Sequence, residues 1–166
     1  MKMDNEQMKS SETRLYQHAT FSILAKHELI RAQRYPSPVT LLHVAINLDE
    51  VEFRFSEHLK RRFAEILNSS LRVADIPAYY GEDYLVLMPV TDEAGGRVVA
   101  QRLISRLMGT EEMDGNDKFT VHVGIASHPG GEGLALEELL GQAAQALQKA
   151  SKQDKHTFIS YSDLSG

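Results

Sequence analysis

The chain has 166 residues, the length of one ordinary domain, and it is long enough to bury a hydrophobic core without disulfides. Its composition, 42% hydrophobic and 25% charged, excludes a disordered chain. The absence of cysteine excludes disulfides, thiolate metal sites and cysteine nucleophiles. A formal net charge of −5 argues against a general DNA- or RNA-binding protein, but it leaves room for a small anionic ligand held by a few arginines.

Membrane and targeting signals are missing from the sequence pattern. No apolar run approaches the roughly 20 residues that span a bilayer, and the polar start of the chain lacks the apolar stretch of a signal peptide. We therefore expect no membrane span, and we expect a cytoplasmic location, with which the lack of cysteine is compatible. The expected organisation is a flexible segment, residues 1–11, followed by a single domain, residues 12–166.

The first predicted element is a helix from about Glu12 to Arg34. Its apolar residues fall near one stripe, and no proline interrupts the segment before Pro36. The residues of the expected stripe are Leu15, Ala19, Ile23 and Ile30.

Strand and hairpin patterns follow this helix. The apolar run Val39–Asn47 is typical of a strand that is buried on both faces. Apolar residues three and four apart predict an amphipathic helix over Phe53–Leu71. The apolar segments Ile76–Tyr80 and Tyr84–Pro89 flank Gly81-Glu82-Asp83, and this arrangement predicts an antiparallel hairpin.

The last third of the chain continues the alternation. Thr91 and Asp92 are predicted to cap a helix whose apolar stripe, from Val99 to Met108, ends at Gly109. After a polar loop, Thr110–Lys118, the expected elements are a strand at Phe119–Ala126, a helix at Leu136–Lys152 and a short strand at Thr157–Tyr161. This order predicts an α/β (α+β) sandwich, with helices around a mixed sheet that contains the antiparallel hairpin.

Five short strings, in this order along the chain, resemble motifs of the GGDEF domain, the bacterial cyclase that condenses two GTP into cyclic di-GMP. The strings are Thr13–Gln17 (TRLYQ), Arg31–Tyr35 (RAQRY), Leu85–Pro89 (LVLMP), Phe119–Ala126 (FTVHVGIA) and Gln142–Leu147 (QAAQAL). The resemblance covers nearly the whole chain and implies the nucleotidyl-cyclase-like fold of that family.

The residues that carry the family's chemistry are largely replaced. Joining two triphosphates needs divalent metal ions held by carboxylates, but Ala45 and Asn47 stand where the family has its two strand aspartates. The degenerate signature comprises Tyr80, Gly81, Glu82, Asp83 and Tyr84. Alignment from either side of it disagrees by one residue, so we expect a shortened turn.

The resemblance therefore implies an inactive cyclase. The segment Leu48–Arg54 replaces the loop that surrounds guanine in the family and is shorter. For Glu82 and Asp83 we prefer a solvated turn to metal binding, and for His43 and His122 we prefer structural roles. We expect no catalytic residue, no metal site and no cofactor.

A second set of family residues is kept. Arg72 and Asp75 match the R-x-x-D of the family's inhibitory site, which binds cyclic di-GMP, and Arg102 matches the second arginine of that site. Arg31 matches an arginine that a neighbouring domain contributes when stacked ligand bridges two copies. An arginine fork can donate to guanine O6 and N7, while a carboxylate can accept from guanine N1 and N2.

These residues favour a cyclic di-GMP receptor, which in this family is associated with exopolysaccharide export and biofilm formation. The receptor would act as a homodimer or with a partner protein of a signalling or secretion complex. One alternative is a scaffold that dimerises or docks on a partner through its first helix. Another is a regulator that keeps GTP without turning it over, and an active cyclase ranks last.

Overall fold

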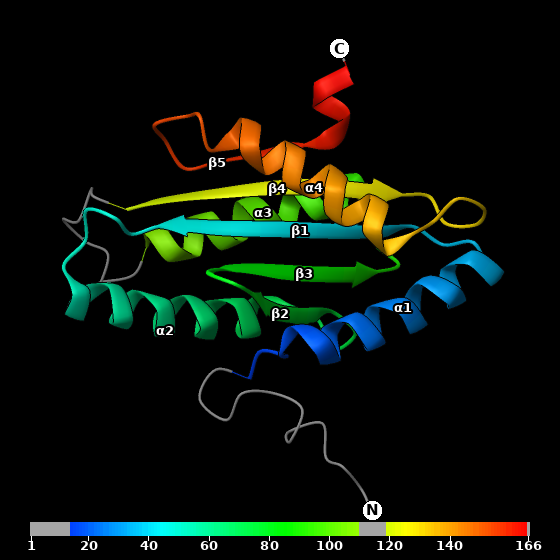
Figure 1. Ribbon diagram of the computed structural model, residues 1–166, viewed down its shortest axis with the longest axis horizontal. Coiled ribbons are helices and arrows are strands. Elements are labelled where there is room, and N and C mark those ends of the chain that lie inside the picture. The colour runs from blue at the N-terminus through cyan, green and yellow to red at the C-terminus, as the bar shows by residue number, and fades with distance from the viewer. Residues whose placement is uncertain (1–13, 110–118, 166) are drawn as a thin grey trace, which may run out of the picture.

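The computed structural model describes residues 14–109 and 119–165 (Figure 1). Helices and strands alternate along the chain in the predicted order. The elements are α1 (His18–Arg34), β1 (Val39–Asn47), α2 (Phe53–Ser70), β2 (Ile76–Tyr80), β3 (Asp83–Pro89), α3 (Glu93–Met108), β4 (Thr120–His128), α4 (Leu136–Ala150), β5 (Thr157–Ser160) and the short 3₁₀ helix η2 (Tyr161–Ser165).

The five strands form one mixed sheet in the order β2-β3-β1-β4-β5. The central strand β1 is antiparallel to both β3 and β4, and β2 and β3 form an antiparallel hairpin. The edge strand β5 runs parallel to β4. The predicted fold class, an α/β sandwich with a mixed sheet and an antiparallel hairpin, is confirmed.

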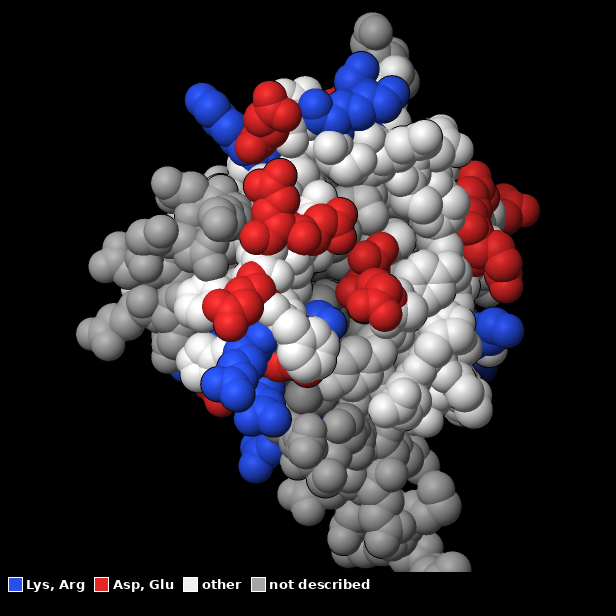
Figure 2. Space-filling model, turned by 60° about the vertical axis from the view of Figure 1, so that its left-hand side comes forward, with Lys and Arg blue, Asp and Glu red and all other residues white. Residues whose placement is uncertain are grey.

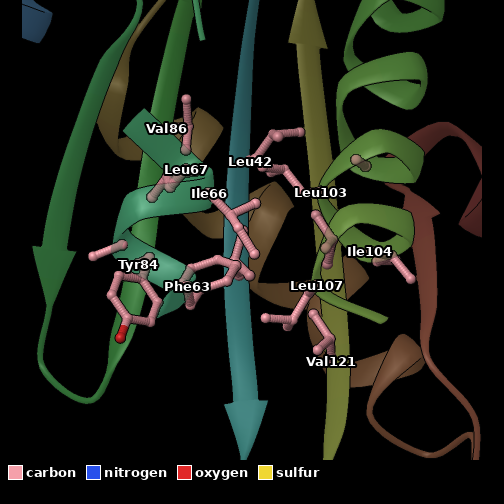
Figure 3. Close-up of a cluster of buried hydrophobic side chains, with 14 of the residues drawn as sticks. Leu42, Phe63, Ile66, Leu67, Tyr84, Val86, Leu103, Ile104, Leu107 and Val121 are labelled. Carbon is pink, nitrogen blue, oxygen red and sulfur yellow. The ribbon is translucent and has the colours of Figure 1, made fainter. Parts of the chain in front are cut away.

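Each face of the sheet is covered by two helices, which explains why its strands read as continuous apolar runs. On β1, Leu42 and Val44 belong to the core under α2 and α3, whereas Val39 and Leu41 belong to the core under α1 and α4. Figure 3 shows the first core, in which Leu103 of α3 and other side chains of α2, α3 and the strands meet over the sheet.

The N-terminal helix begins later than predicted. It starts at His18, because the chain before it runs along the edge of the sheet beside β2. The N–H of Tyr16 donates to the carbonyl of Pro77 at 3.0 Å, and the carbonyl of Tyr16 accepts from the N–H of Tyr79 at 3.0 Å. Residues 12 and 13 lie outside the described residues, as do 1–11 and the predicted loop 110–118.

The predicted stripe of this helix was also wrong. Ile23 and Ile30 are 60% and 61% exposed, and the residues of α1 that pack on the sheet are Phe21, Ala25, Leu29 and Ala32. Leu15, the first residue of the predicted stripe, is fully buried but lies before the helix begins. No helix of the described part of the chain is long and apolar enough to cross a bilayer.

Candidate functional site

The carboxyl end of β1 and the β2–β3 turn form the region where the family resemblance places cyclase chemistry. Ala45 and Asn47 lie on β1, and the side-chain oxygen of Asn47 accepts from the N–H of Asp49 at 3.0 Å. The turn consists of Gly81 and Glu82, because Tyr80 already pairs with Asp83. Gly81 has a φ of 61°, a left-handed conformation that glycine adopts without strain and that fits the first position of a two-residue hairpin turn.

The carboxylates of this region are engaged by nearby cationic or ionisable groups. Oδ2 of Asp83 lies 2.8 Å from Nε2 of His43, and Oε2 of Glu82 lies 4.0 Å from Nζ of Lys60. Among the described residues, no group of three or more His, Asp or Glu side chains is placed to hold a metal ion. Within this stretch of sheet, the carboxylate of Asp83 is thus the partner of the His43 imidazole.

A hollow of about 380 Å³ lies beside this turn. Figure 2 shows acidic side chains gathered on this end of the molecule. Burial raises the pKa of Tyr84, which lines the hollow, and Tyr79 and the carboxylates of Glu82, Asp83 and Glu57 add to the effect. The negative charge of these carboxylates repels a triphosphate when no metal ion is bound. The hollow is lined by Ile46, Leu48, Asp49, Val51, Phe53, Ser56, Lys60, Glu82 and Tyr84.

The second region lies at the other end of β3, where Arg72 and Asp75 form a closed ion pair. Oδ2 of Asp75 accepts from the backbone N–H of Arg72 at 2.9 Å and from its Nε at 3.4 Å, and Oδ1 accepts from Nη2 at 3.0 Å. The N–H of Asp75 donates back to the carbonyl of Arg72 at 3.0 Å. The pair thus lies in a tight turn that follows the end of α2.

The two side chains of this pair differ in exposure. The Asp75 side chain is 3% exposed, whereas that of Arg72 is 56% exposed. Both oxygens of Asp75 therefore accept hydrogen bonds from Arg72 and are largely covered, and a direct contact of this carboxylate with guanine stays a prediction. The carboxylate orients the guanidinium of Arg72, and the guanidinium is the group that solvent or a ligand can reach.

Arg72 also contacts two residues that sequence reasoning missed. Nη2 of Arg72 donates to the carbonyl of Pro89 at 2.7 Å and to Oγ1 of Thr91 at 2.6 Å. Pro89 and Thr91 lie 17 and 19 positions after Arg72, so no local sequence pattern links them to it. The predicted hairpin could have indicated these contacts, because pairing Ile76 with Leu87 brings the start of β2 beside the end of β3.

Arg102 completes the cleft from α3. Its Nη1 donates to the carbonyl of Ser70 at 3.3 Å, at the C-terminal end of α2. Arg72, Asp75 and Arg102 share one cleft of about 480 Å³. Its wall also includes the N-terminal turn of α3, where the predicted cap, Asp92, accepts from the N–H of Gly95 at 2.9 Å.

Arg31 is not part of this cleft. It lies on α1, on the opposite face of the sheet, and its side chain is 63% exposed beside Glu28, with 4.0 Å between Nη1 and Oε2. The structure therefore brings together three of the four predicted ligand-binding residues.

The chain belongs to the GGDEF domain family. Residues 11–157 match the family model described as "Diguanylate cyclase, GGDEF domain". Among characterised proteins, the chain is similar to the response regulator PleD of Caulobacter vibrioides, with 26% identity over 163 residues that cover 93% of this chain and 35% of PleD. The chain thus spans about a third of the length of that relative.

Solved structures agree with this assignment at the level of the fold. The GGDEF domain of DgcB from Caulobacter crescentus, determined in complex with c-di-GMP, has a TM-score of 0.81 at 14% identity and covers 98% of this chain and 99% of its own. The diguanylate cyclase SiaD from Pseudomonas aeruginosa, in complex with its activator SiaC, has a TM-score of 0.77 at 21% identity and covers 94% of this chain and 63% of its own.

Proposed function

We propose that this domain is a catalytically inactive GGDEF domain that acts as a cyclic di-GMP receptor. The observation that carries the proposal is the convergence of the local pair Arg72 and Asp75 with Arg102, which lies on α3, on one cleft. The DgcB structure, which holds c-di-GMP, shares the fold and supports the choice of ligand.

The two arginines provide the ligand contacts in this proposal. The side chain of Arg72 is half exposed, and its guanidinium offers N–H groups to the O6 and N7 atoms of guanine or to a phosphate oxygen. Arg102, whose recorded hydrogen bond to Ser70 is long, can turn toward the same ligand. Asp75 acts through Arg72, because its oxygens are occupied and buried.

Arg31 enters the proposal through a second copy of the domain. Its exposed guanidinium on the opposite face of the sheet is free to reach a ligand held by a neighbouring molecule. A stacked pair of cyclic di-GMP molecules would then bridge two copies, and the ligand would shift the equilibrium toward the bridged state by binding it preferentially. Size-exclusion chromatography with and without ligand, on the wild type and on Arg31→Ala, tests this part.

The inactivity of the domain is proposed from the other end of β3. Ala45 cannot ligate a metal ion, Asn47 has no charge, and Asp83 is bound to His43. Incubation with radiolabelled GTP and Mg²⁺ is expected to give no cyclic di-GMP. Product formation above a blank without protein would overturn this half of the proposal.

Isothermal titration calorimetry with micromolar cyclic di-GMP tests the receptor half. Arg72→Ala and Arg102→Ala are each expected to weaken binding by at least about a hundredfold, or roughly 3 kcal/mol. Arg61→Ala is the matched control, because Arg61 is exposed on α2 and does not line the cleft. Absence of heat with the wild-type chain, or equal affinities for all four proteins, would refute the proposal.

A second candidate function is a scaffold that docks on a partner protein through α1. Ile23 and Ile30 favour it, because they lie seven residues apart on this helix and are 60% and 61% exposed. The two candidates predict different results for Arg72→Ala. A scaffold keeps its partner binding in that variant and loses it in Ile23→Glu.

A further inference from the structure

The hydroxyl of Thr91 lies at the centre of the contacts that fix Arg72. Oγ1 accepts from Nη2 of Arg72 at 2.6 Å and donates its own hydrogen to the carbonyl of Pro89 at 3.0 Å. The same Nη2 also reaches Pro89 at 2.7 Å and Oδ1 of Asp75 at 3.0 Å. Two N–H bonds thus serve three acceptors, which commits this nitrogen fully to the protein.

The backbone of Thr91 is tied to the sheet on both sides. Its N–H donates to the carbonyl of Pro38 at 3.1 Å, and its carbonyl accepts from Oγ1 of Thr40 at 2.8 Å. Thr40 is fully buried on β1, and its hydroxyl lies 2.7 Å from that of Ser127 on β4. The acceptor offered to Arg72 is therefore attached to the two central strands.

The side chain of Thr91 is oriented by Gly95 in the first turn of α3. A Cβ atom at position 95 would lie 2.9 Å from Cγ2 of Thr91, closer than such atoms approach. The methyl group of Thr91 thus occupies the space that this glycine leaves, and the hydroxyl lies on the side of Arg72.

The residue before Thr91 has an unusual backbone conformation. Val90 has a φ of 50°, in the left-handed region that a β-branched residue rarely adopts. Such a conformation persists only where its surroundings impose it. Here the flanking residues, Pro89 and Thr91, are both held by Nη2 of Arg72. The sharp bend is thus part of the arrangement that brings the hydroxyl to the guanidinium.

We infer that Thr91 is a positioning residue for the ligand contact made by Arg72, an inference that rests on the proposed function. Thr91, Pro89 and Asp75 take Nη2, and Asp75 takes Nε, so Nη1 is the guanidinium nitrogen without a hydrogen bond within residues 14–109 and 119–165. A fixed guanidinium with one uncommitted nitrogen suits an anionic or carbonyl oxygen of a cyclic dinucleotide, and the orientation needs no ordering on binding.

Three substitutions test this role in the full chain. Thr91→Val keeps the shape and removes the hydroxyl, Thr91→Ser keeps the hydroxyl, and Thr91→Ala removes the hydroxyl without placing a methyl group beside Arg72. Calorimetry with cyclic di-GMP is expected to show about tenfold weaker binding for Thr91→Val and Thr91→Ala, and binding within about twofold of wild type for Thr91→Ser. Thermal melts identify any variant that does not fold.

A measurement without ligand separates this inference from the proposed function. In ¹⁵N NMR spectra of the arginine side chains, the wild type and Thr91→Ser are expected to show slow rotation and protected exchange of the Arg72 guanidinium. Thr91→Ala and Thr91→Val are expected to show faster rotation and exchange. If the wild type fails to bind cyclic di-GMP while these differences appear, the proposed function fails and the positioning role stands.

Two outcomes would overturn the inference itself. One is an unchanged Arg72 guanidinium signal in folded Thr91→Ala. The other is equal affinity of folded Thr91→Ala and Thr91→Ser for cyclic di-GMP in a wild-type background that binds it.

Discussion

The two ends of β3 differ in the way charged groups are used. At the hairpin end, Asp83 is bound by His43, and the remaining turn carboxylate, Glu82, is 93% exposed beside Lys60. At the other end, Asp75 is buried and holds Arg72, whose guanidinium remains half exposed. Figure 1 shows these ends on opposite sides of the molecule, with β3 running between them.

The difference shows what a binding site requires besides charge. The hairpin end has several charged groups, but Asp83 is paired with His43 and Glu82 is exposed to solvent. The arginine end has fewer groups, and they are held in one orientation by buried acceptors. An oriented, partly exposed cation can bind an anion with little ordering cost, whereas an exposed flexible pair contributes little.

The largest expected effect on stability is that of removing the buried Asp75, and Asp83 at the other end of β3 provides the comparison. Asp75→Ala is expected to lower the free energy of unfolding by about 2 to 3 kcal/mol, because three hydrogen bonds to a buried carboxylate are lost. Asp83→Ala is expected to cost less than about 1 kcal/mol, since its side chain is 33% exposed. Urea unfolding followed by circular dichroism compares them, and equal costs would contradict the distinction between the two ends.

A smaller effect is expected when the packing of Thr91 is disturbed from α3. In Gly95→Ala the new methyl group displaces that of Thr91, which lies 2.9 Å from the new Cβ position. We expect about fivefold weaker binding of cyclic di-GMP, or roughly 1 kcal/mol, despite a higher helix propensity. Gly141→Ala is the matched control, because nothing lies within 4 Å of a Cβ at that position of α4. Loss of affinity in the control alone would oppose the prediction.

The strained residue gives an effect of opposite sign. Val90→Gly is expected to raise the free energy of unfolding by about 1 kcal/mol, because a left-handed conformation costs a non-glycine residue roughly 1 to 2 kcal/mol. The lost valine packs little, since it is 55% exposed. Thermal unfolding by calorimetry measures the change, and a lower melting temperature would mean that the bend is not strained.

The smallest expected effect is a pH dependence that arises from His156, beside the β4–β5 edge of the sheet. Burial, and then the charge of His122, lowers the pKa of His156, whose Nδ1 accepts from the N–H of Val121 at 3.0 Å. Because the pKa of His156 in the folded protein lies below the ordinary value of 6.5, folding favours the neutral imidazole. The stability that this preference contributes is present above about pH 6.5 and is lost as the pH falls below it. Urea unfolding of the wild type and of His156→Gln at pH 7.5 and 5.5 measures this. The free energy of unfolding should change differently with pH in the two proteins, and an identical change would contradict the prediction.

Much of the fold could be predicted because its strands and three of its helices carry strong patterns. β1 is buried on both faces and reads as an unbroken apolar run, and α2 has apolar residues at helical spacing. The start of α1 could not be predicted in this way. Leu15 fits a helical stripe, but the hydrogen bonds of Tyr16 to β2 are long-range and take the segment out of the helix.

The candidate site was predicted in its charged residues but not in the groups that orient them. Arg72 and Asp75 form a local motif, and Arg102 lies on a predicted helix. Thr91 was predicted to share in capping that helix, and the structure assigns the cap to Asp92 alone. The bond of Thr91 to Arg72 depends on the bend at Val90 and on the hairpin register, which local sequence patterns do not specify.

The bridge between Tyr16 and Ala78 joins the segment before α1 to the edge of the sheet. The segment that precedes α1 is attached to β2, and β2 begins at the residue that follows Asp75. Displacement of that segment is therefore expected to act on β2, the strand that directly follows Asp75 of the cleft.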